Sequence, residues 1–164
     1  MTTRRAFLKA GLVGGALLAA GGLAATPAGR DPVRDRRQVL AGVVPAVLAG
    51  ALPEDAAARE AAVLRCIDGV EQAIAGLSPS AQEEAAQLFA LLAIAPTRVL
   101  LAGLGSAWDE AGVDAVSAFL ERWRGHSLGL MRSGYHALHD LVFGAWYADP
   151  STWEAIGYPG PLKL

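Results

Sequence analysis

The chain has 164 residues, a formal net charge of −2 and a single cysteine. Three of its 14 basic residues precede residue 29, which leaves 11 basic against 16 acidic residues in the rest of the chain. This acidic surplus argues against a nucleic-acid partner. A single cysteine also rules out an internal disulfide, an iron–sulfur cluster held by cysteines and covalent attachment of haem.

The first nine residues contain a paired arginine followed by an aromatic residue, a leucine and a lysine, namely Arg4, Arg5, Phe7, Leu8 and Lys9. An uncharged apolar stretch follows over residues 10–25. This order is typical of the signal read by the twin-arginine translocase, which exports folded proteins. As a helix the stretch would span ~24 Å, short of the ~30 Å hydrocarbon core of a bilayer. We therefore expect a cleavable signal peptide over 1–28 and a helical domain over 29–164, with an uncleaved anchor as the alternative.

The rest of the chain predicts helices, because alanine and leucine dominate and strand and hairpin signals are missing. A first helix is expected over 35–49, kinked or broken at Pro45. The second should carry Pro53 in its first position and end after Ile74. Its expected buried stripe is Val63, Ile67, Val70 and Ile74.

The third predicted helix opens at Ser80, and Glu83 three residues later completes a capping-box pattern. Residues 88–94 are apolar on every side. A helix with one face exposed to solvent would carry polar residues on that face. We therefore expect this helix at the centre of the fold, buried on all sides. Pro96 should end it, and Thr97 should cap a short continuation.

Two further helices complete the prediction. A short helix is expected to begin at Asp114 and to end at Gly125. Its apolar residues, which should face the core, are Val116, Phe119, Leu120 and Trp123. The last long helix covers 127–148 and is followed by one turn over 151–156. Its expected core stripe is Leu128, Met131, Tyr135, Leu138, Val142 and Ala145. The predicted fold class is all-α, a small irregular helical bundle after the signal segment.

The best candidate for chemistry is a polar patch on the last long helix, formed by Arg132, His136, His139 and Asp140. Helical spacing places the four beside the core stripe, with His136 and Asp140 able to pair as i, i+4 neighbours. A metal site would need further ligands from elsewhere, and an acid–base pair would need a substrate motif to serve. The third interpretation is a polar helix face that touches another protein. We find no motif for a cofactor held by this chain.

Aromatic residues near the C-terminus supply a second candidate. Trp123 and Trp146 have helix spacing, so we expect them to be packed, whereas Trp153 and Tyr158 lie in a segment rich in proline and glycine. Aromatic residues anchor protein interfaces, which favours the last two for a partner surface. Cys66 is expected to be a small buried residue, with a covalent bridge to a partner chain as the alternative.

The ending over residues 145–161 reads AWYADPSTWEAIGYPGP. It resembles the end of the gluconate 2-dehydrogenase subunit 3 group, the small subunits of membrane-associated flavin dehydrogenase complexes. The twin-arginine leader is also typical of that group. The matching positions at the C-terminus are Trp146, Tyr147, Trp153, Gly157, Tyr158 and Pro159.

This resemblance implies an all-helical, non-catalytic companion of a large flavoprotein of the glucose–methanol–choline oxidoreductase type. The small subunit would provide the export signal, the partner would hold FAD, and a cytochrome c subunit often completes such a complex. It further implies a periplasmic location, membrane-associated through the partners. No catalytic residue carries over. Two alternatives stay open: a free-standing periplasmic binding module using the patch of Arg132, His136, His139 and Asp140, and an independent enzyme.

Overall fold

The structure is a computed structural model, and it describes residues 31–153 and 157–160. That part of the chain contains helices and turns and no strand, so the all-α prediction is confirmed. The elements in chain order are α2 (Pro32–Val47), α3 (Ala56–Ala75), α4 (Pro79–Ala93), α5 (Ala95–Thr97), the π-helical turn η1 (Arg98–Ala102), α6 (Val113–Arg124), α7 (Gly129–Ala148) and the 3-10 turn η2 (Pro150–Thr152).

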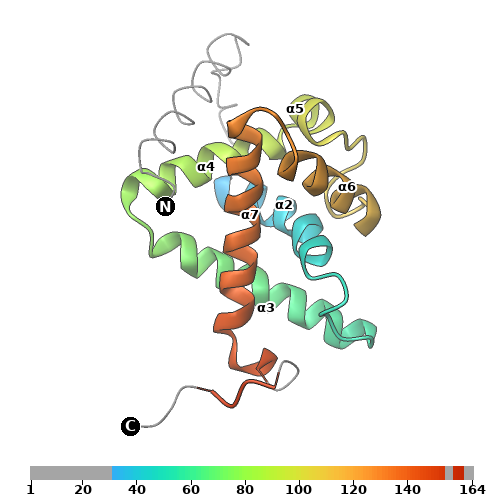
Figure 1. The fold of residues 1–164 in the computed structure, drawn as a ribbon, viewed down its shortest axis with the longest axis vertical. Coiled ribbons are helices and arrows are strands. Elements are labelled where there is room, and N and C mark those ends of the chain that lie inside the picture. The colour runs from blue at the N-terminus through green and yellow to red at the C-terminus, as the bar shows by residue number, and fades with distance from the viewer. Residues whose placement is uncertain (1–30, 154–156, 161–164) are drawn as a thin grey trace.

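Helix α2 lies at the centre of the bundle. It contacts α3, α4, α6 and α7, and Figure 1 shows these helices arranged around it. Its side chains at Val39, Leu40, Val43 and Val44 are fully buried. Pro45 does not break it, because the helix continues to Val47.

The prediction that α4 is the central helix is therefore wrong. Only Phe89 and Leu92 of α4 are buried, whereas Leu88 and Leu91 are partly exposed and Ala90 is exposed. The position is taken by α2, whose inward face is continuous and whose charges are gathered at its N-terminal end. Apolar composition alone did not indicate which helix has neighbours on all sides.

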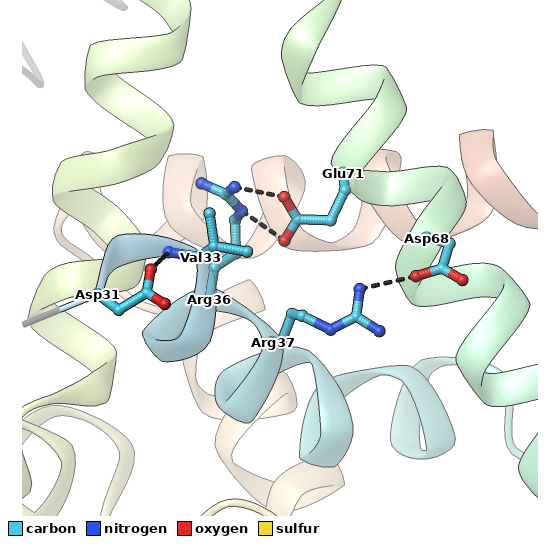
Figure 2. A network of polar contacts seen from close by, with 6 residues as sticks. All are labelled: Asp31, Val33, Arg36, Arg37, Asp68 and Glu71. Carbon is cyan, nitrogen blue, oxygen red and sulfur yellow. Dashed lines mark hydrogen bonds and ion pairs between the residues drawn. The ribbon is translucent and has the colours of Figure 1, made fainter.

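Polar contacts fix the N-terminal half of α2 against α3 (Figure 2). The Arg36 guanidinium forms a two-pronged ion pair with Glu71, with Nε 2.8 Å from Oε1. Asp68 lies one turn before Glu71 on α3, and its Oδ1 is 2.7 Å from Arg37 Nη1. Asp31 caps α2 by accepting a hydrogen bond from the Val33 amide at 3.0 Å. These pairs orient the two helices at the edge of the buried core.

Three predicted helix starts are shifted, and α2 begins at Pro32, three residues before its expected start. Helix α3 begins after Asp55, whose carboxylate accepts from the Ala58 amide at 2.8 Å, and Pro53 lies before the helix. An acidic cap at Asp55 is the stronger start signal because it satisfies a free amide. The capping box over Ser80 and Glu83 is also wrong, because Ser78 is the N-cap and Pro79 already takes the first helical position.

Two indole hydrogen bonds and two ring contacts join α6 and the loop before it to α4 and η1. Trp108 Nε1 donates to the Leu92 carbonyl at 2.9 Å, and Trp123 Nε1 donates to the Leu101 carbonyl at 3.1 Å. Phe119 packs edge-on between the two indoles, with centroids 5.6 and 4.7 Å away. Helix α6 thus buries the apolar residues predicted for it, and it ends at Gly125 as expected.

Helix α7 packs along α3 through Leu138, Val142 and Ala145. Leu128, the first residue of its predicted core stripe, is 57% exposed because it is the N-cap and lies outside the helix. Cys66 lies in the α3–α7 contact at 3% exposure, with Sγ 3.7 Å from the Val142 carbonyl oxygen. Its burial agrees with the prediction of a small core residue and leaves the sulfur out of reach of a partner chain.

Candidate functional site

The polar patch predicted on α7 does not form the expected pairs. The Arg132 guanidinium turns back to the start of its own helix and donates to the Ser127 carbonyl at 2.9 Å. Asp140 lies 3.3 Å from His139 Nδ1, and the expected pairing of His136 with Asp140 is wrong. The His136 ring instead contacts the ring of Tyr135. Within residues 31–153 and 157–160, no group of three or more histidine, cysteine or acidic side chains is placed to hold a metal ion.

A row of four rings runs along the outer side of α7. Tyr135, His139, Phe143 and Tyr147 follow each other at intervals of four residues, and we call them the aromatic row. Successive ring centroids lie 5.4, 4.4 and 5.6 Å apart, and the last pair is stacked. Each ring therefore touches the next along the helix.

The row results from the two faces of α7. Leu138, Val142 and Ala145 turn inward to the core, and the residues at every fourth position beside them lie at the boundary with solvent. The first three rings of the row are partly exposed, and Tyr147 at its end is 49% exposed. Because each ring packs against the next, the row presents a continuous aromatic surface.

The C-terminal ending continues this surface. Trp153 Nε1 donates to the Tyr147 carbonyl at 2.8 Å, which holds the indole beside the last turn of α7. The Tyr158 ring packs edge-on against Trp153 at 5.2 Å, and the Tyr158 amide donates to the Trp153 carbonyl. Tyr158 is 45% exposed, and Pro159 is exposed beside it. The predicted partner residues Tyr147, Trp153, Tyr158 and Pro159 are thus neighbours at one end of the molecule.

Trp146 differs from the other residues of this ending. Its side chain is only 6% exposed and belongs to the core, in agreement with the packing prediction. Its carbonyl oxygen accepts from the Thr152 hydroxyl at 2.9 Å, and Thr152 is itself buried. Trp146 therefore supports the ending from beneath and is not part of its surface.

Asp149 fixes the direction in which the chain leaves α7. Its carboxylate accepts from the Ser151 amide at 2.9 Å and lies 3.3 Å from Arg65 Nε on α3. The hydrogen bond from Ser151, together with the nearby Arg65, lowers the pKa of Asp149 below its ordinary value. The carboxylate is therefore charged at neutral pH, and it caps η2 while tying the ending to α3.

Two members of the aromatic row, Tyr135 and Phe143, were not predicted as site residues. Tyr135 had been placed in the core stripe, and Phe143 had been given no role. The repeated spacing of four residues was visible in the sequence, since rings at i and i+4 lie on one helix face. The export residues Arg4, Arg5, Phe7, Leu8 and Lys9 lie outside the described residues.

Comparisons with protein-family models, with curated proteins and with solved structures find no match for this chain. The likeness of the ending to small dehydrogenase subunits accordingly stays a prediction. The feature of the described residues that invites a functional interpretation is the aromatic row with Trp153 and Tyr158.

Proposed function

We propose that this chain is a non-catalytic accessory subunit that binds a flavin-dependent dehydrogenase through the aromatic row and the C-terminal ending. The partner is a large flavoprotein of the glucose–methanol–choline type, which holds FAD. A cytochrome c subunit is a further member of the assembly. The complex reaches the periplasm by the twin-arginine route.

The observation that carries this proposal is the run of touching, partly exposed rings from Tyr135 to Tyr147, continued by Trp153 and Tyr158. Aromatic side chains bury a large area for little loss of conformational freedom, and they dominate the binding energy of protein interfaces. These rings are already held in place by one another and by the Trp153 hydrogen bond. A surface ordered before binding loses less entropy when a partner covers it.

The expected leader fits the same proposal. The twin-arginine route carries folded proteins, so a subunit with an export signal can bring a bound flavoprotein with it. The binding-module alternative needs Arg132, His136, His139 and Asp140 to act together. Arg132 is engaged at the start of α7, and His136 contacts Tyr135, so the geometry favours the accessory subunit.

The test is copurification of the tagged full chain with a flavoprotein of the glucose–methanol–choline type from the same cells. Tyr147→Ala removes the most exposed ring of the aromatic row and should weaken the complex by ~2 kcal/mol, about thirtyfold, the size of an interface hot spot. The matched control is Leu64→Ala on α3, since Leu64 is similarly exposed at 47% and lies outside the row. Bound flavin and the mass of the copurified chain report the result.

A second arm separates export from binding. Arg4→Lys combined with Arg5→Lys should leave both this chain and the flavoprotein in the cytoplasm, still bound to each other. If the dehydrogenase reaches the periplasm without this chain, the escort role is wrong. If Tyr147→Ala and Leu64→Ala bind the flavoprotein equally well, the aromatic row is not the interface.

A further inference from the structure

The junction of α4, α5 and η1 projects an apolar turn into solvent. Leu100 is 81% exposed and Val99 is 52% exposed. Ala95 and Pro96, about one turn earlier, are exposed as well. We call these four residues the apolar tip. An exposed cluster of this kind is unusual on a small domain and marks a contact surface.

The turn cannot bury these residues by a local rearrangement, because its backbone is held on the inner side. The Leu101 carbonyl accepts from Trp123 Nε1 at 3.1 Å, and the Ala102 carbonyl accepts from Arg122 Nη2 at 2.6 Å. Gly103 then leaves the turn with a left-handed φ of 69°, which glycine adopts without strain. Fixing residues 101–103 inward holds residues 99 and 100 outward.

Two arginines contact the turn that carries the apolar tip. Residues 85–97 contain no charged side chain, and the first one after them is Arg98 within the turn. Arg98 reaches the Leu104 carbonyl at 3.4 Å, and Arg122 bonds the Ala102 carbonyl at the end of the turn. An apolar tip with two arginines at its base is complementary to a bilayer that carries anionic headgroups.

The apolar tip differs in kind from the aromatic row. Its members are aliphatic side chains and a proline, without the tyrosine or tryptophan that anchors a protein interface. Figure 1 places α5 and the C-terminal ending at opposite ends of the long axis of the molecule. The two surfaces can therefore be occupied at the same time by different partners.

The hydropathy of this region agrees with lipid contact. Among the described residues no single helix is long and apolar enough to cross a membrane, but Pro79–Ala93 together with Ala95–Ala102 reaches that length and composition as a pair bent by 83°. A full crossing would pull Phe89 and Leu92 out of the protein core. Insertion limited to the tip leaves them in place.

We propose that the apolar tip inserts Val99 and Leu100 into the boundary between the headgroups and acyl chains of an anionic membrane, with Arg98 and Arg122 at the headgroup level. Two aliphatic side chains and two basic residues give weak, reversible binding. The consequence is an orientation: the α5 end faces the lipid, and the C-terminal ending lies away from it.

The test uses the full chain with one environment-sensitive fluorophore. Leu100→Cys in a Cys66→Ala background carries the label at the tip, and Leu64→Cys in the same background carries it on α3 as the matched exposed control. Vesicles of phosphatidylcholine with phosphatidylglycerol are compared with vesicles of phosphatidylcholine alone. We expect a blue shift and a rise in emission for the label at 100 only, stronger with the anionic lipid. Arg98→Gln should raise the lipid concentration at half-maximal response about fivefold.

Other outcomes would overturn the proposal. Equal responses at 64 and 100 mean adsorption through another part of the chain, and no response at 100 means no insertion. A response at 100 to the copurified flavoprotein, with none to vesicles, means that protein covers the tip. If the label at 100 disturbs folding by circular dichroism, Val99→Cys carries the probe one residue earlier, and the same outcomes decide.

Discussion

Helices α2 and α4 have exchanged the roles that their compositions suggest. Helix α4 is the more apolar in sequence, yet only Phe89 and Leu92 are buried in it. Helix α2 begins with four charged residues among its first six, yet it forms the centre of the bundle through Val39, Leu40, Val43 and Val44. The composition of a helix gives the amount of apolar surface that it carries. The number of neighbouring helices decides how much of that surface is buried.

The difference between them identifies surface left for other molecules. In α2 the apolar residues meet other helices of this chain, so they stabilise the fold. In α4 and the turn after it, part of the apolar surface, up to Leu100, meets no other helix in the described residues. The three predictions below measure how strongly the fold depends on each helix.

The largest expected effect is at Leu40, which is fully buried in α2. Leu40→Ala should lower the free energy of unfolding by ~3 kcal/mol, because it removes buried methyl groups and leaves a cavity in the core. Leu91→Ala on the partly exposed side of α4 should cost ~1 kcal/mol or less. Urea unfolding of both variants checks the comparison, and equal losses would contradict the central position of α2.

The second effect depends on a close approach. A Cβ added at Gly42 would lie 2.5 Å from the Trp108 carbonyl oxygen, which is backbone and cannot turn aside. Gly42→Ala should therefore destabilise the fold by ~2 kcal/mol, although alanine favours helix. Gly144→Ala on α7 is the matched control: a Cβ there meets nothing within 4 Å, and a gain of up to ~1 kcal/mol is expected. Thermal unfolding distinguishes them, and a stabilised Gly42→Ala would refute the close packing of α2 on Trp108.

The smallest effect concerns the ion pairs of Figure 2. Arg36 and Glu71 are 13% and 19% exposed, whereas Arg37 and Asp68 are 39% and 56% exposed. Arg36→Gln should cost ~1–2 kcal/mol because it leaves a partly buried carboxylate without its bonded cation. Arg37→Gln should cost less than ~0.5 kcal/mol, since water screens an exposed pair. Denaturant midpoints with and without added salt report both, and similar values would mean that the α2–α3 contact does not depend on Arg36.

Much of the fold could be predicted where local signals act alone. In α6 the apolar residues from Val116 to Trp123 follow one helical stripe, and Gly125 ends the helix, so the sequence was sufficient. The starts of α3 and α4 were misplaced because two cap candidates lie within three residues, and only the folded backbone chooses between them. The central helix could not be predicted, because its burial depends on contacts between elements far apart in the chain.

The candidate site was predicted in part. Tyr147, Trp153 and Tyr158 are brought together as a surface, whereas Trp146 lies beneath it. The four residues of the predicted polar patch do not act as one group, because helical spacing gives the direction of a side chain and not its partner. Arg132 is long enough to reach back to the Ser127 carbonyl before the helix, and it donates there at 2.9 Å instead of joining the histidines.

The reactivity of the Cys66 thiol reports the separation of α3 and α7. Burial, and to a lesser degree the nearby Asp149 carboxylate, raises the pKa of its thiol to about 11, and its sulfur is shielded between α3 and α7. Only the thiolate reacts with alkylating reagents, so modification of the native chain has to wait until α7 separates from α3. The rate at which Cys66 is alkylated therefore measures how often α3 and α7 separate, without any added label.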